Sequence, residues 1–96
     1  MTYTVTNIKG NSSKNVLPSG YSSWINYWEK QTGKKAVFCS CSRCTQFAKD
    51  GAHVKVAGHG EYWYIVPLCH KHNESPYVFT VEGPLVPVNQ DMPILE

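Results

Sequence analysis

The feature that most constrains this chain is a group of cysteines and histidines in its middle. Cys41 and Cys44 are separated by two residues, and after a gap of 24 residues Cys69 and His72 repeat that spacing. Thiolate and imidazole are ligands that zinc prefers, and a two-residue spacer lets both side chains of a pair point to one centre. The spacing therefore predicts a tetrahedral structural zinc site formed by these four residues.

Cys39 is an alternative to Cys41 in this ligand set. The longer spacing between Cys39 and Cys44 is also permitted, whereas a Cys39 that binds no metal would be a small apolar residue on a strand. We prefer Cys41 because the two-residue spacing is the commoner one, so the substitution Cys39→Ser is expected to be mild. His59 and His70 are expected to face solvent.

Two other chemistries use the same residue types. A Cys-x2-Cys pair can cycle as a redox dithiol, and a cysteine beside a histidine can act as a nucleophile. Neither role explains the second pair, and a thioredoxin-like dithiol would also need a βαβ setting. In a reducing compartment, cysteines at these spacings indicate metal ligands rather than disulfides.

The size of the chain makes a metal staple useful. With 96 residues the chain has room for one domain, 1–96, and a domain of that size buries only about 60 to 65% of its unfolded surface. Zinc binding by finger peptides is worth on the order of 10 to 16 kcal/mol, which is comparable to the whole stability of a domain. The formal charge of +2 is too small to indicate a nucleic-acid partner by itself.

No segment of the sequence predicts a membrane location. The chain has no apolar run of the ~20 residues that a membrane-spanning helix needs. Residues 1–14 also lack the apolar segment of a signal peptide. We therefore expect a soluble protein of the cytoplasm without a membrane partner.

The first half of the chain predicts one strand and one helix. Residues 2–8 predict a half-buried strand, which residues 10–15 interrupt. A helix is expected to begin after a capping Ser22 or Ser23 and to run to about Thr32. We expect its apolar face to pack on the core rather than to stack on bases, since any packed helix has such a stripe. That face consists of Tyr21, Trp24, Ile25 and Trp28.

The second half predicts a mainly β structure. A hairpin is expected from two strands, followed by a short helical turn at residues 73–75, and the tail at residues 89–96 is expected to be loosely held. The expected strands cover residues 53–56, 62–66, 77–81 and 85–88. The predicted fold class is therefore α+β, a small single domain that is mostly β with one main helix and is built around the zinc site.

The order of these features in residues 38–75 resembles the treble-clef zinc module of the HNH (ββα-metal) nucleases. A cysteine turn, Gly51-Ala-His-Val, a β-hairpin and Val66-Pro-Leu-Cys-x2-His-Asn follow one another as in that module. The resemblance is greatest to the branch typified by the phage endonuclease that resolves DNA junctions. It implies that His53 is a general base that activates water, and that Asn73 is a ligand of a catalytic Mg2+ or Mn2+.

Departures from that family's pattern decide the expected function. Ala52 stands where that branch has an acid, the usual HNH branch has a second histidine where Asn73 stands, and Tyr64-Ile-Val lacks the middle Asn. Because Mg2+ prefers carboxylate ligands, we expect a retained zinc scaffold whose nuclease pocket is degenerate. The nearest acids that could substitute are Asp50, Glu61 and Glu74.

The expected function is therefore that of a zinc-stabilised module of HNH-like descent that binds nucleic acid or a protein partner without catalysis. The alternative is a metal-dependent endonuclease that hydrolyses phosphodiesters with His53 as general base. A carboxylate close to both His53 and Asn73 would favour the alternative.

Overall fold

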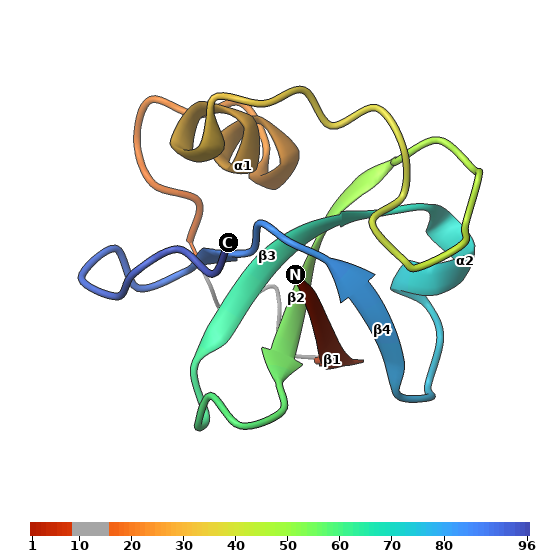
Figure 1. Ribbon diagram of the computed structural model, residues 1–96. Helices are drawn as coiled ribbons and strands as arrows, with labels where there is room; N and C mark the ends of the chain where they lie inside the picture. Colours follow the sequence, from red (N-terminus) through yellow and green to blue (C-terminus); the bar gives the residue numbers. More distant parts are fainter. Residues whose placement is uncertain (9–15) are drawn as a thin grey trace.

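Figure 1 shows the computed structural model, which describes residues 1–8 and 16–96. The interruption predicted at residues 10–15 lies outside the described residues. The predicted α+β class, mostly β with one main helix, is confirmed. Along the described chain the elements are β1 (Thr2–Asn7), α1 (Trp24–Thr32), β2 (Asp50–Val56), β3 (Trp63–Leu68), α2 (His70–Asn73), β4 (Phe79–Glu82) and β5 (Val86–Pro87).

The strands join one antiparallel sheet in the order β4-β1-β2-β3-β5. The predicted hairpin is confirmed as β2 and β3, with His53 opposite Ile65 in the register. Both strands extend further than predicted, since β2 begins at Asp50 and β3 ends at Leu68. The hairpin therefore ends beside the second pair of predicted metal ligands, where α2 begins (Figure 1).

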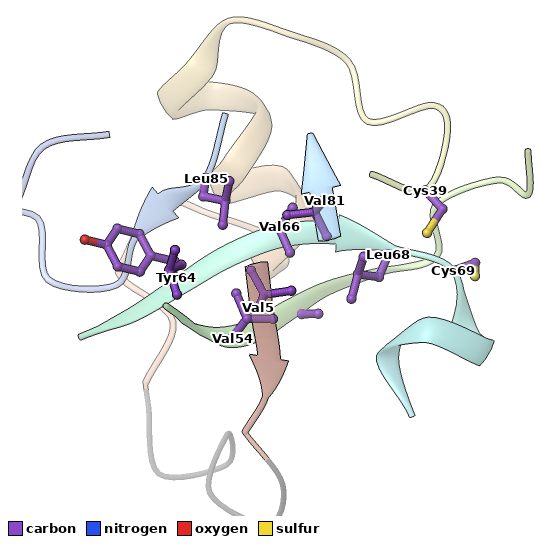
Figure 2. Close-up of a cluster of buried hydrophobic side chains, with 11 residues drawn as sticks. Val5, Cys39, Val54, Tyr64, Val66, Leu68, Cys69, Val81 and Leu85 are labelled. Carbon is purple, nitrogen blue, oxygen red and sulfur yellow. The ribbon is translucent and has the colours of Figure 1, made fainter. Parts of the chain in front are cut away.

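The sheet has a core on each face. Helix α1 lies across one face, over β2, β3 and β5 (Figure 1), and packs Tyr27 and Trp28 against Ile65. The opposite face carries a second core, part of which Figure 2 shows. Successive side chains of a strand point to opposite faces, so Ile65 faces α1 whereas Tyr64 and Val66 face the second core. Because both faces are covered, β3 is an almost continuous apolar run.

The limits of α1 follow from its capping residues. Ser23 is the N-cap, and its hydroxyl accepts a hydrogen bond of 3.0 Å from the backbone N–H of Asn26. Gly33 ends the helix with φ 73°, a left-handed conformation that glycine adopts without strain, and its N–H donates to the Glu29 carbonyl at 2.8 Å. The predicted helix from Ser23 to Thr32 is thus confirmed.

The packed face of α1 differs in part from the predicted stripe. Trp28 is buried as expected, and its indole N–H donates to the Pro84 carbonyl at 2.9 Å. Tyr27, which was not part of the stripe, is completely buried, and its hydroxyl is satisfied by donating to the Pro87 carbonyl at 2.9 Å. Trp24 packs at the margin of this core, and Ile25 turns toward the start of β2.

Two expectations for the second half need correction. The short helix begins at His70 rather than at residue 73, directly after Cys69 in the N-cap position. The tail is not loose, because the N–H and carbonyl groups of Leu95 pair with those of Leu85 at 2.9 and 2.8 Å. Ile94 and Leu95 also pack against the two cores.

Candidate metal centre

The structure brings three cysteines and one histidine together at one end of the hairpin. The ligand atoms of Cys39, Cys44, Cys69 and His72 all lie within 4.8 Å of one another. The His72 Nδ1 atom is 3.2 Å from the Cys69 Sγ and 3.7 Å from the Cys39 Sγ, and the sulfurs of Cys44 and Cys69 are 4.0 Å apart. A tetrahedral zinc ion holds such atoms roughly 3.5 to 3.8 Å apart. This cluster could therefore hold a metal ion such as zinc.

A short two-stranded ribbon delivers the first two ligands. The Cys39 N–H donates to the Gln46 carbonyl at 2.8 Å, and Phe38 pairs with Phe47 across the ribbon. The chain reverses at Arg43, whose φ of 67° is uncommon for a residue other than glycine. This reversal directs Cys44 back toward Cys39. We refer to residues 37–48 as the cysteine ribbon.

The other two ligands come from the junction of β3 and α2. Cys69 is the N-cap of α2, and its carbonyl accepts the Asn73 N–H at 2.9 Å. The single turn between them presents His72 on the same side as the Cys69 sulfur. Asn7 on β1 holds this turn from outside, since its amide donates to the carbonyls of His72 and Ser75 at 2.6 and 3.0 Å. Nothing in the local sequence around Asn7 indicates this role.

The geometry favours the alternative ligand Cys39 over the preferred ligand Cys41. The backbone around Cys41 pairs with β4: Cys41 bridges Val81, and the Ser42 N–H donates to the Thr80 carbonyl at 2.9 Å. The Cys41 sulfur lies 3.8 Å from the Ser42 carbonyl and outside the cluster. The predicted residues Cys44, Cys69 and His72 are brought together, and Cys39 takes the fourth position.

The surroundings of the thiols are suited to a bound cation. Burial raises the pKa of Cys39 to about 12. Burial also acts on Cys69, but hydrogen bonds from the His72 backbone N–H and from the Cys39 and Cys44 thiols outweigh it, so the pKa of Cys69 is lowered. Zinc binds thiolates, and without a cation the buried Cys39 would stay protonated at neutral pH. A metal ion would therefore compensate for burying these sulfurs.

His53 and Asn73 both line a second feature, a hollow of about 460 Å³. We call it the helix-start hollow, because Ser23, Trp24 and Ile25 at the start of α1 form one wall and Lys49 and Asp50 another. Its floor is close-packed, since a Cβ atom at Gly51 would lie 2.6 Å from the Ile25 backbone nitrogen.

His53 is 6% exposed and has an unusual environment for an imidazole. Its ring packs edge-on against Trp24, with ring centroids 4.9 Å apart. Its Nε2 atom has no hydrogen-bond partner among the residues that the structure describes. Burial lowers the pKa of His53, so the ring is neutral at neutral pH.

Asn73 lies beside an acid, although not beside the position where the resemblance led us to look for one. Its amide donates to the Asp50 Oδ2 atom at 3.2 Å, and the His70 Nδ1 atom lies 3.9 Å from the same oxygen. Ala52, at the position of the family's acid, is buried in the core. Glu61 instead pairs with Lys55 at 2.8 Å, and Glu74 lies 3.2 Å from His70.

A further hollow, of about 480 Å³, adjoins the metal cluster. We call it the cluster hollow. Its lining includes three of the metal ligands, and the remaining side chains are Gln46, Phe47, Lys49, His70 and Lys71. Lys49 lines both hollows, which therefore adjoin each other.

Comparisons with protein families, with curated proteins and with solved structures gave no match to this chain. The resemblance to the HNH nucleases is therefore supported by the sequence pattern alone. None of the helices in the described residues has the length and apolar character that crossing a membrane requires.

Proposed function

We propose that this chain is a zinc-stabilised module of HNH-like, treble-clef descent that binds nucleic acid without cleaving it. The observation that carries the proposal is the cluster of Cys39, Cys44, Cys69 and His72, which a zinc ion would close. Closure would fasten the cysteine ribbon to the end of the hairpin. It would thereby hold both hollows in one arrangement, because Lys49 and α2 stand between them.

The residues that line the helix-start hollow suit a phosphate-bearing ligand. The start of a helix carries partial positive charge from its unpaired N–H groups, and the residues of the first turn line this hollow. Lys49 adds a full positive charge, and the neutral His53 can donate one hydrogen bond. Asp50 is the opposing charge, and Asn73 donates to it.

Asp50, His53 and Asn73 all line the helix-start hollow, but Asp50 is the only acid among the described residues that line it, and this favours binding over catalysis. The Asp50 carboxylate lies near Asn73 and His70, both on α2. The His53 ring packs instead against Trp24 on α1. A nuclease needs the cation and the general base to act on one phosphate, and a hard cation needs more than a single carboxylate.

Fluorescence anisotropy with labelled single-stranded and duplex oligonucleotides tests the binding proposal. We expect binding by the zinc-loaded chain that weakens steeply as salt is added, because phosphate contacts release counterions. Lys49→Ala is expected to weaken binding. The control is Lys55→Ala, which removes the same charge roughly 20 Å along the strand from Lys49. This variant is expected to bind as the unmodified chain does. Absence of binding, or binding insensitive to salt, would refute the proposal.

A second candidate function is metal-dependent phosphodiester hydrolysis, and the contact between Asp50 and Asn73 favours it. These two residues would hold Mg2+ or Mn2+, which stabilises the charge that develops on the phosphate. His53, with its lowered pKa, would take a proton from the attacking water while the bond to the leaving oxygen breaks.

Plasmid nicking separates the two candidates. Supercoiled plasmid, a branched junction and single-stranded RNA are incubated with the zinc-loaded chain and each metal. We expect no cleavage above background, because general-base catalysis alone supplies only about 10²- to 10⁴-fold. Nicking that requires the metal and disappears in both His53→Ala and Asp50→Asn would establish the second candidate instead.

A further inference from the structure

The cysteine ribbon presents two aromatic rings to solvent. Phe38 and Phe47 are 58% and 65% exposed, and their rings stack with centroids 5.5 Å apart and planes inclined by only 11°. The neighbouring Val37 is 48% exposed. We call the two rings the phenylalanine platform. Neither ring belongs to one of the two core clusters of the described residues, so core packing does not account for their positions.

The platform is carried by the same backbone segment that delivers two of the four candidate metal ligands. Phe38 and Phe47 are paired across the ribbon, next to the hydrogen bond of 2.9 Å between the Ala48 N–H and the Val37 carbonyl. Phe38 directly precedes the ligand Cys39, and Phe47 follows Cys44 by three residues. A metal ion bound by these cysteines would fix the platform before any ligand arrives.

Positive charge surrounds the platform in sequence and in space. Residues 34–49 include Lys34, Lys35, Arg43 and Lys49 and contain no acid. Phe47 lines the cluster hollow together with Lys49, His70 and Lys71, and none of the described residues lining this hollow is acidic. Asp50 and Glu74 approach the imidazole of His70, and the Glu29 carboxylate accepts the Ala36 N–H at 2.9 Å, so each of these acids already has a partner.

We propose that the phenylalanine platform stacks an unpaired base of a single-stranded nucleic acid, while Lys49 and Lys71 bind the adjacent phosphates. The inference rests on the proposed function and names its ligand class and base subsite. Aromatic faces with cations beside them fit a ligand with flat apolar bases on a polyanionic backbone. A duplex fits less well because its bases already stack on one another. An apolar peptide would leave the lysines without counter-charge.

Anisotropy titrations of the zinc-loaded full chain test this inference. Phe47→Ala is expected to weaken binding of a short single strand by roughly 5- to 150-fold, the loss typical of one stacked base. Phe38→Ala should weaken it in the same direction. The matched control is Tyr77→Ala, which removes an aromatic ring that is 76% exposed elsewhere. This control should bind as the unmodified chain does.

A strand without bases provides an independent readout. An abasic oligonucleotide of the same length keeps the phosphates, so it should bind weakly to the unmodified chain, and Phe47→Ala should cause no further loss. Zinc content and far-UV dichroism confirm that each variant is folded; both rings are exposed, so neither variant should unfold.

The possible failures are distinguishable. If no nucleic acid binds the unmodified chain, both the proposed function and this inference fall. If nucleic acid binds but Phe47→Ala binds equally well, or the duplex binds as tightly as the single strand, only the platform is refuted. A loss in Tyr77→Ala equal to that in Phe47→Ala would refute it as well.

Discussion

At the residue scale, Cys39 and Cys41 are two residues apart but have different surroundings. Cys39 is 5% exposed and belongs to the core that also contains Cys69. Figure 2 shows these two cysteines together at one end of that core. Cys41 is less buried and lies on the backbone segment that pairs with β4. A metal bound by Cys39 is therefore continuous with the core.

This difference predicts opposite effects of two conservative substitutions. Cys39→Ser is expected to lower zinc affinity by more than the ~10- to 100-fold that loss of an outer-shell partner costs, because a direct ligand is removed. Cys41→Ser is expected to leave zinc affinity within a few-fold of the unmodified chain. Competition with a chelating dye measures both. The reverse order would restore Cys41 as the ligand.

The spacing of the cysteines could predict three of the clustered residues but not the fourth. Cys44, Cys69 and His72 follow from local spacing alone. The choice between Cys39 and Cys41 depends on a contact with Val81, which is 40 residues further along the chain than Cys41. Contacts at such separations leave no periodic signal in a single sequence. Asp50, the acid beside Asn73, was one of three candidates named from the sequence, but the choice among them depends on a contact between the start of β2 and α2 that the sequence does not show.

His53 is expected to make stability depend on pH. Burial lowers its pKa in the folded state below the ordinary value of 6.5, so below that pH the unfolded chain takes up a proton that the folded chain resists. Its contribution is therefore fully present above that value and is lost as the pH falls toward the folded pKa. Urea midpoints from about pH 8 to about pH 5.5, the range in which histidine titrates, should fall less in His53→Phe than in the unmodified chain. Equal slopes would contradict this prediction, because the two proteins differ only at residue 53.

At the scale of elements, α1 is attached to the sheet by two side chains with both apolar and polar contacts. Tyr27 and Trp28 are buried against Ile65 and Val86, and each donates a hydrogen bond to a carbonyl near β5. Amphipathic periodicity predicted Trp28, but it did not predict Tyr27. The partner of the Tyr27 hydroxyl is Pro87, which lies 60 residues away in sequence. The same kind of distant pairing, between Leu85 and Leu95, orders the tail.

Trp28→Ala is expected to lower the free energy of unfolding by about 3 to 5 kcal/mol, because a buried aromatic side chain is lost and a cavity remains. The matched control is Ile25→Ala on the same helix, where the side chain turns to the helix-start hollow and the cost should be smaller. Urea unfolding measures both. If Trp28→Ala kept its stability but lost nucleic-acid binding, the helix would be a stacking platform rather than a core element.

At the scale of the whole molecule, the cluster of cysteines and His72 lies where the structure has the least regular secondary structure. Helix α2 has a single turn and no buried residue, and the cysteine ribbon is held by isolated bridges rather than by a named strand of the sheet. The rest of the described chain has the β2–β3 hairpin and the covering helix α1. A bound metal would thus join the cysteine ribbon to the junction of β3 and α2, which lies further along the chain.

Removal of the metal is therefore expected to unfold the chain rather than to loosen one loop. Cys39 and Cys69 are members of the core cluster that also contains Leu68 and Val81, so losing the metal leaves unpaired thiols within that core. The free energy of zinc binding, on the order of 10 to 16 kcal/mol, equals or exceeds the total stability of about 5 to 15 kcal/mol that a domain of this kind has. Native mass spectrometry should find one zinc per chain and its loss on treatment with a strong chelator, with collapse of the far-UV dichroism. A metal-free chain that kept its dichroism and melting temperature would assign the stability to the packing of the sheet and α1, and would refute a structural role for zinc.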